Sequence, residues 1–122
     1  MSDSLRLLDR SAIGLSGLCL IHCLALPAAA VALPMLGSLA SAEWVHVAFV
    51  ALAAPLSAFA LGRSGAWRSP LLAGLAAFGL GLLAAGAFVA PTHGLETAMT
   101  VVGGLCLALC HGLNLRRGRH HA

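Results

Sequence analysis

Residues 71–89 read LLAGLAAFGLGLLAAGAFV and contain no ionisable side chain. A helix that crosses the hydrocarbon core of a bilayer needs about 20 mostly apolar residues, and this stretch has that length. Three more apolar stretches of similar length occur in the chain. We therefore predict an all-α integral membrane protein with four spanning helices, at about residues 11–33, 43–62, 70–90 and 95–115, forming one domain over residues 1–122.

The composition excludes a soluble domain. Hydrophobic residues make up 60% of the chain and charged residues 9%, and the mean hydropathy is +0.95. Soluble domains have roughly 45–50% apolar and about 25% charged residues. Because no length remains for a soluble catalytic domain, we expect no enzyme activity. The acidic residues lie outside the apolar stretches or at their ends, as expected in a bilayer; they are Asp3, Asp9, Glu43 and Glu96.

The connections between the apolar stretches are short and rich in turn-forming residues, such as GRSGAWRSP at 62–70 and Pro91 with Gly94. Such connections predict an up-down-up-down four-helix bundle. All seven arginines then fall on one side, which the positive-inside rule assigns to the cytoplasm. We expect both termini on that side, in the inner membrane, and no nucleic-acid partner. These arginines are Arg6, Arg10, Arg63, Arg68, Arg116, Arg117 and Arg119.

A cleaved signal peptide is an alternative interpretation of the first apolar stretch. Arginines precede it, and Ala40, Ser41 and Ala42 resemble a cleavage site. However, the apolar part of a signal peptide is about 7–15 residues long, and this stretch is longer and contains His22 and two cysteines. We therefore favour a spanning helix.

The first helix contains a group of soft metal ligands. Cys19, His22 and Cys23 are three and four residues apart, so they share one helical face. Thiolates favour soft ions such as Hg(II), Cu(I) and Zn(II), and imidazole suits several of the same metals. Pro27 cannot donate a hydrogen bond to the carbonyl of Cys23, which predicts a kink beside this thiol. A buried cysteine can also be an inert apolar residue.

The fourth helix has a similar pattern, with Cys106, Cys110 and His111. If helices 1 and 4 adjoin, these thiols lie at depths that match those of Cys19 and Cys23. They could then relay an ion inward. Asn114 could cap the last turn of this helix.

Two carboxylate and imidazole pairs are predicted near the outer face. Glu43 and His46 open the second helix and share a face, and His93 and Glu96 open the fourth. His46 lies about one turn inside an apolar helix, and ionisable groups inside a membrane are functional candidates by default. Interfacial capping by the two glutamates is the alternative.

Small residues recur every four positions on the third and fourth helices. Such ladders allow close helix packing and could also support a homodimer. The two ladders are Ala73, Ala77, Gly81 and Ala85, and Thr100, Gly104, Ala108 and Gly112.

The sequence resembles the MerC family of small mercuric-ion transport proteins over nearly its whole length. The resemblance lies in residues 11–27, SAIGLSGLCLIHCLALP, and in several later positions. It implies a membrane protein that takes Hg(II) from the periplasmic side and passes it to the cytoplasm by thiol exchange. The later positions are Trp44 with His46, Pro55, Leu56 and Ser57, His93 with Glu96, and His111 with Asn114.

The sequence departs from the MerC pattern in two places. Typical members carry Cys-x-x-Cys in helix 1, whereas Cys19 and Cys23 are four residues apart, and Cys23 is our choice for the matching thiol. Typical members also have a cytoplasmic cysteine pair after helix 4, where this chain has His120 and His121. These differences leave room for Zn(II) or copper in place of Hg(II).

Three hypotheses follow. The first is a transporter with no tightly bound cofactor, in which His46, His93 and Glu96 collect a soft metal ion, Cys19, His22 and Cys23 accept it, and helix 4 relays it. The second is a haem-binding or redox subunit, which needs paired histidines at matched depth, such as His22 with His111. The third is an accessory membrane protein without a metal of its own.

Overall fold

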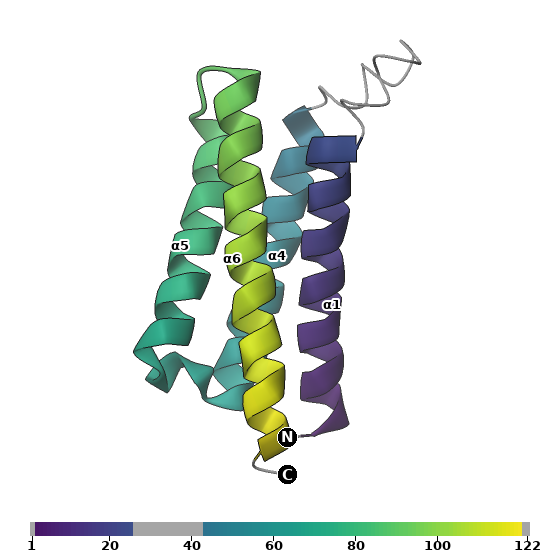
Figure 1. The fold of residues 1–122 in the computed structure, drawn as a ribbon, viewed down its shortest axis with the longest axis vertical. Helices are drawn as coiled ribbons and strands as arrows, with labels where there is room; N and C mark the ends of the chain where they lie inside the picture. Colours follow the sequence, from purple (N-terminus) through teal and green to yellow (C-terminus); the bar gives the residue numbers. More distant parts are fainter. Residues whose placement is uncertain (1, 26–42, 121–122) are drawn as a thin grey trace.

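The computed structural model describes residues 2–25 and 43–120 as an antiparallel bundle (Figure 1). Its long helices alternate in direction, and the two termini lie at the same end, hereafter the termini end (Figure 1). All four spans are long and apolar enough to cross a membrane. The elements are α1 (Asp3–Leu20) with the π-helical turn η1 (Ile21–Ala25), α4 (Glu43–Ser64), the short 3-10 helix η3 (Ala66–Arg68), α5 (Pro70–Phe88) and α6 (His93–His120).

The first and last helices extend further toward the termini end than the hydropathy indicated. α1 begins at Asp3, eight residues before the expected start, and α6 continues to His120. The early turns of α1 carry charged residues, and Asp3 in its first turn is favoured by the positive N-terminal end of the helix dipole. The expected stretch from 26 to 33, with Pro27, lies outside the described residues, as does His121.

The turn between α4 and α5 is built on a glycine. Gly65 has a φ of 71°, in the left-handed region that only glycine adopts readily, and it is followed directly by η3. Pro70 then occupies the first turn of α5, where its missing N–H costs no hydrogen bond. This tight reversal places α5 beside α4.

α5 and α6 pack through glycines. A Cβ atom added to Gly103 would lie 2.7 Å from the carbonyl oxygen of Gly79, and one added to Gly86 would lie 2.9 Å from Thr100. The prediction that the small-residue ladder of α5 forms its packing face within the bundle is wrong, because Ala77 and Gly81 are exposed. The buried face of α5 instead contains Leu72, Ala76, Gly79, Leu83 and Gly86.

The predicted α6 ladder is partly confirmed. Thr100 and Gly104 are buried, and Gly104 faces Leu20 and the carbonyl of Ser16 on α1. Ala108 and Gly112 are only half-buried. The small residues of α6 therefore serve two neighbours, α1 through Gly104 and α5 through Gly103.

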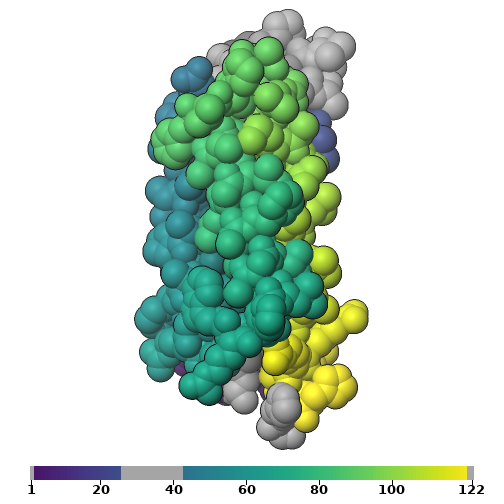
Figure 2. Space-filling view, turned by 90° about the vertical axis from the view of Figure 1, so that its left-hand side faces the viewer, coloured from purple at the N-terminus to yellow at the C-terminus, as the bar shows by residue number. Residues whose placement is uncertain are grey.

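The outer surface of the bundle is apolar. Figure 2 shows α5 in front, between α4 and α6, on an elongated molecule. Large apolar side chains point outward along every span, as expected where a helix faces lipid rather than water. They include Leu18, Leu24, Trp44, Phe59, Phe78, Phe88 and Leu105. Polar groups are gathered inside the bundle, where the candidate site lies.

Candidate metal centre

Three metal-ligating side chains meet inside the bundle, near the end opposite the termini. They are His22 and Cys23 from η1 and His46 from α4, and one ligand atom of each lies within 4.8 Å of the others. All three side chains are buried. Among the described residues this is the one such group of three. We call it the thiol-imidazole cluster.

The π-helical turn places two of these ligands. A π-helix has wider turns than an α-helix, so it rotates successive residues by less than the α-helical angle of about 100°. His22 and Cys23 are adjacent in sequence, yet both are buried on the inner face. The departure from α-geometry occurs beside the carbonyl of Cys23, where the sequence predicted a kink. Turns of this kind are frequent at functional sites.

The Cys23 thiol has two polar neighbours from other helices. Its Sγ lies 3.4 Å from Nε2 of His46 and 3.2 Å from Oγ1 of Thr100 on α6. The Thr100 hydroxyl is itself held by the carbonyls of Glu96 and Thr97, at 2.9 and 3.1 Å. Three helices therefore fix the position of one sulfur atom.

Glu96 connects this thiol to the outer end of the bundle. Its Oε1 lies 2.7 Å from Nδ1 of His46, and its Oε2 lies 3.2 Å from Nδ1 of His93. The first contact is at ion-pair distance but lacks hydrogen-bond geometry, and Nε2 of the same ring is directed at Cys23. Metal-ligating histidines are commonly oriented by such a carboxylate.

The predicted grouping of His46, His93 and Glu96 is thus present, but the predicted pair of Glu43 with His46 is wrong. Glu43 is exposed, and the carboxylate beside His46 comes from α6. Spacing along one helix indicated Glu43 as the partner of His46 because it gives no information about contacts with other helices.

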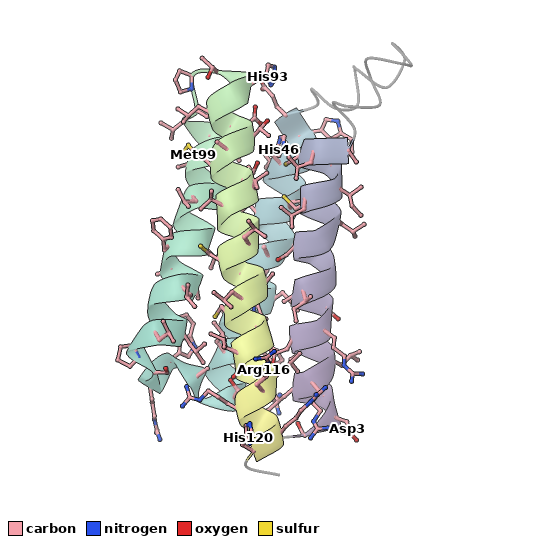
Figure 3. All side chains as sticks on the ribbon, viewed as in Figure 1. Asp3, His46, His93, Met99, Arg116 and His120 are labelled. Carbon is pink, nitrogen blue, oxygen red and sulfur yellow. The ribbon has the colours of Figure 1, made fainter. Side chains whose placement is uncertain are left out.

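An open depression of about 160 Å³, hereafter the outer depression, opens at the end of the bundle opposite the termini and reaches Glu96. In Figure 3, His93 lies at that end, with His46 below it toward the interior. The side chain of His93 is largely exposed, whereas that of Glu96 is mostly buried. The depression is lined by Glu43, Ala90, Pro91, Thr92, His93 and Glu96.

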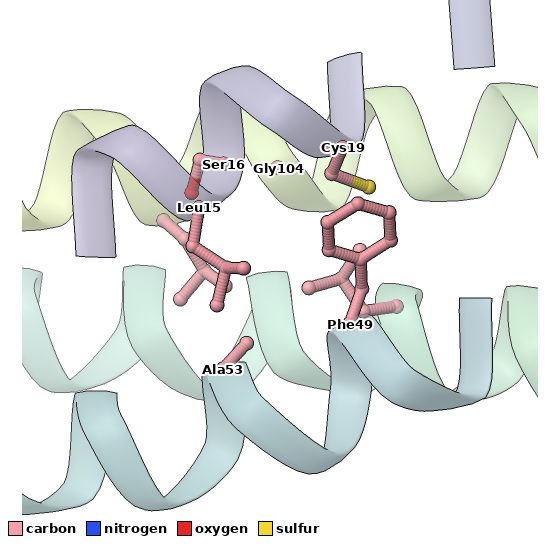
Figure 4. A pocket seen from close by; sticks show the side chains of 8 residues that line it. Leu15, Ser16, Cys19, Phe49, Ala53 and Gly104 are labelled. Carbon is pink, nitrogen blue, oxygen red and sulfur yellow. The ribbon is translucent and has the colours of Figure 1, made fainter. Parts of the chain in front are cut away.

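Cys19 lies one turn below Cys23 in the same buried cluster. It lines a small cavity between the four helices, of about 10 Å³, which is roughly the space for one water molecule (Figure 4). Phe49 forms part of this cavity and also packs against the ring of His22 at 6.1 Å. Cys19 is therefore buried where the cavity and the thiol-imidazole cluster meet.

The predicted ligands of α6 do not form a second group of this kind in the described part of the chain. The Cys110 thiol donates a hydrogen bond to the carbonyl of Leu72 on α5, at 3.3 Å. Cys106 is half-buried and lies close to Gly79, also on α5. His111 instead faces α1 and α4. The two cysteines therefore face α5, away from the side of α6 that carries His111.

His111 belongs to a second buried polar cluster, toward the termini end. Its Nδ1 donates to Oδ1 of Asp9 at 2.6 Å, and the Ser57 hydroxyl donates to its Nε2 at 3.0 Å. Asn114 donates to the other oxygen of Asp9 at 2.8 Å, so it does not cap the helix as predicted. We call these four side chains the Asp9 network.

The sequence analysis missed Asp9 and Ser57 as site residues. Asp9 was expected outside the membrane-buried part, yet its exposure is 0%. One signal was available, because Asp9 continues the buried face of the first helix at steps of three and four residues. That face contains Asp9, Ala12, Ser16, Cys19 and Cys23.

The predicted pairing of His22 with His111 for haem is not found in residues 2–25 and 43–120. His22 lies against His46, with ring centroids 5.0 Å apart and nearly perpendicular rings, whereas His111 is held by Asp9. A macrocycle does not fit between rings at that separation. The donor set of one thiol and two imidazoles, with a second thiol next to it, instead suits a soft metal ion.

Comparison with known families agrees with this chemistry. The model of the family described as MerC mercury resistance protein matches residues 9–116, nearly the whole chain. Comparisons with curated proteins and with solved structures found no match. The matched region includes both polar clusters, the second and third spans in full and most of the first and fourth. The chain, a multi-pass membrane protein, therefore belongs to the MerC mercury resistance protein family.

Proposed function

We propose that this protein binds Hg(II) at Cys23, His22 and His46 and carries it across the inner membrane into the cytoplasm. The observation that carries the proposal is the convergence of these ligand atoms within 4.8 Å inside an apolar bundle. Sulfur and nitrogen donors favour a soft ion over hard ions such as Mg(II), which need several oxygen ligands.

Capture begins in the outer depression. His93 is exposed there, and Glu96 links it to His46 through contacts of 3.2 and 2.7 Å. An ion bound between His93 and Glu96 is therefore one side chain away from the buried ligands. The carboxylate also lowers the cost of bringing a cation into the apolar bundle.

Transfer to Cys23 is a ligand exchange. The metal–sulfur bond replaces the S–H bond, and the thiol proton leaves through the water of the outer depression. Thr100 accepts or donates a hydrogen bond at this sulfur, so it can accompany the change from thiol to thiolate. Cys19, buried in the same cluster, supplies a second sulfur for the inward step.

The direction of transport follows from the arginines. They lie on the turns and helix ends toward the termini end, which the positive-inside rule places in the cytoplasm. The outer depression then faces the periplasm. A reporter fused after Ala122 is expected to be active only in the cytoplasm, and activity restricted to the periplasm would contradict this orientation.

Equilibrium binding of Hg(II) to the purified protein tests the proposal. Cys23→Ser is expected to weaken binding by about 100-fold or more, beyond the 10–100-fold loss typical of a residue that only orients a ligand. Ala25→Ser is the matched control, because Ala25 is exposed two residues away. Equal affinity for Hg(II) in the two variants would contradict the proposal, and tighter binding of Zn(II) or Cu(I) than of Hg(II) would contradict the choice of metal.

A further inference from the structure

The Asp9 network has no role in the proposed capture of Hg(II), yet it is the more deeply buried polar cluster. Asp9 and His111 are 0% exposed, and Ser57 is 2% exposed. A carboxylate at such a position in a membrane bundle is costly and is a functional candidate by default. The network draws its members from α1, α4 and α6, the same three spans that surround Cys23.

The two clusters share one arrangement of atoms. In each, a carboxylate lies against Nδ1 of a histidine: Glu96 is 2.7 Å from His46 at ion-pair distance only, and Asp9 is hydrogen-bonded to His111 at 2.6 Å. In each, Nε2 therefore faces a third side chain on another helix. That side chain is the Cys23 thiol at 3.4 Å in one cluster and the Ser57 hydroxyl at 3.0 Å in the other.

The cavity below Cys19 lies between the two clusters. Its walls include Ser16, Ala53, Gly104 and Leu107. Ser57 is one helical turn beyond Ala53, and His111 is one turn beyond Leu107, which is about 6 Å along the bundle axis. The cavity, about 10 Å³ in volume, lines up between the two levels and touches Cys19, whereas Ser57 and His111 lie one turn beyond its walls.

We propose that Nε2 of His111 and Oγ of Ser57 form a second, weaker site for the transported divalent cation, through which the ion leaves the thiols toward the cytoplasm. The site rests on the proposed function for its cargo. A nitrogen and a hydroxyl oxygen hold a soft ion less tightly than thiolates do. Weak binding at an exit is what conduction requires, because an ion must be able to leave each site.

The ligand exchange balances without a further reactant. The metal–sulfur bond breaks, and the ion forms dative bonds to the lone pairs of His111 Nε2 and Ser57 Oγ. Nδ1 of His111 stays hydrogen-bonded to Asp9, so only Nε2 of this ring takes part in the exchange. The thiolate left behind accepts the next cation or a proton from water in the outer depression.

A thiol placed at position 57 tests whether the ion reaches this site. Protein carrying Ser57→Cys is loaded with Hg(II), washed with a small competing thiol, and the metal retained per chain is counted. We expect one more Hg(II) per chain than in the unmodified protein. Ala76→Cys is the control, because Ala76 is 0% exposed but lies in the apolar cluster with Leu61 and Leu72. It is expected to retain no extra metal.

Two results would overturn the second site. One is no additional Hg(II) with Ser57→Cys, and the other is the same gain with Ala76→Cys, which would mean that buried thiols are reached without a defined path. If the unmodified protein retains no Hg(II) while Ser57→Cys retains one ion, binding at Cys23 is contradicted, and access of the ion to position 57 is still supported. If Ser57→Cys retains only as much Hg(II) per chain as the unmodified protein does, the proposed function is supported and the second site is contradicted.

Ser57→Ala provides a second measurement that does not depend on the added thiol. In reconstituted vesicles, its Hg(II) uptake is expected to fall severalfold while the Hg(II) affinity of the solubilised protein is preserved. Ser64→Ala is the matched control, because the Ser64 hydroxyl only bonds the carbonyl of Leu61 in its own helix. Uptake by Ser57→Ala equal to that of the control would overturn the proposal, whatever the outcome of the loading experiment.

Discussion

The thiol-imidazole cluster and the Asp9 network differ in their donor atoms and in their access to water. In each, a carboxylate lies against a histidine whose other ring nitrogen faces a third polar side chain; Glu96 plays this part beside the thiol-imidazole cluster, and Asp9 within its own network. The third atom is sulfur near the outer depression and oxygen near the termini end. Glu96 retains some exposure at 12%, whereas Asp9 has none. Under the proposed function, this exchange of a thiol for a hydroxyl distinguishes the site that retains Hg(II) from the site that releases it.

The largest difference between the clusters is expected in Hg(II) affinity. His46→Asn removes a ligand from the thiol-imidazole cluster and should weaken binding by about 100-fold or more, above the loss for an orienting residue. His120→Asn, at the exposed end of α6, is the control. Titration of the purified variants measures the effect. Similar affinities for the two variants would remove His46 from the centre.

Glu96→Gln is expected to have the next largest effect. The amide loses the negative charge that holds His46 Nδ1, so Hg(II) affinity should fall about 10–100-fold, as for other partners that orient a metal ligand. Glu43→Gln should reduce the Hg(II) affinity much less, because Glu43 is not the carboxylate beside His46. A larger loss of Hg(II) affinity with Glu43→Gln than with Glu96→Gln would support the pairing of Glu43 with His46 that the sequence spacing predicted.

The Asp9 network should matter more for stability than for Hg(II) affinity. Asp9→Asn weakens hydrogen bonds made to a buried charged group, which contribute about 1.5–3 kcal/mol each. The free energy of unfolding in mixed micelles should fall by about that amount, and Asp3→Asn at the exposed start of α1 should change it little. A loss of Hg(II) affinity as large as that of Glu96→Gln would show that the two clusters are not separate.

The smallest effect is expected for Cys106→Ser. This thiol is half-buried against α5, away from both clusters. Hg(II) affinity and uptake should stay within a few tens of per cent of the unmodified protein, about 0.2 kcal/mol at most. A tenfold loss in a binding titration would return Cys106 to the relay that its sequence pattern indicated.

The sequence predicted the spans well because hydropathy acts over whole helices. Residues 71–89 lack ionisable groups, and α5 occupies nearly that range. The contact face of α5 was wrong for a geometric reason. Steps of four residues drift by roughly 40° per step around a helix, whereas alternating steps of four and three hold one face. Gly79 and Gly86 lie on such an alternating face, and Gly81 does not.

The candidate site was predicted only within single helices. Periodicity brought Cys19, His22 and Cys23 to one face, and the structure buries all three. The contacts of His46 with Glu96, and of His111 with Asp9, join residues far apart in sequence. Such contacts depend on how the helices rotate against one another, which close packing at Gly79 and Gly103 helps to set. Spacing within one helix carries no information about that rotation.

X-ray absorption at the mercury edge of the loaded protein identifies the atoms that bind Hg(II). We expect sulfur and imidazole nitrogen ligands around the ion, and the same spectrum when Cys106 and Cys110 are both changed to Ser. We also expect that Cys23→Ser removes a sulfur ligand and that His46→Asn removes a nitrogen ligand. A spectrum that keeps its sulfur and nitrogen shells in Cys23→Ser and His46→Asn, or that loses its sulfur with the α6 cysteines, would contradict the assignment of the metal centre.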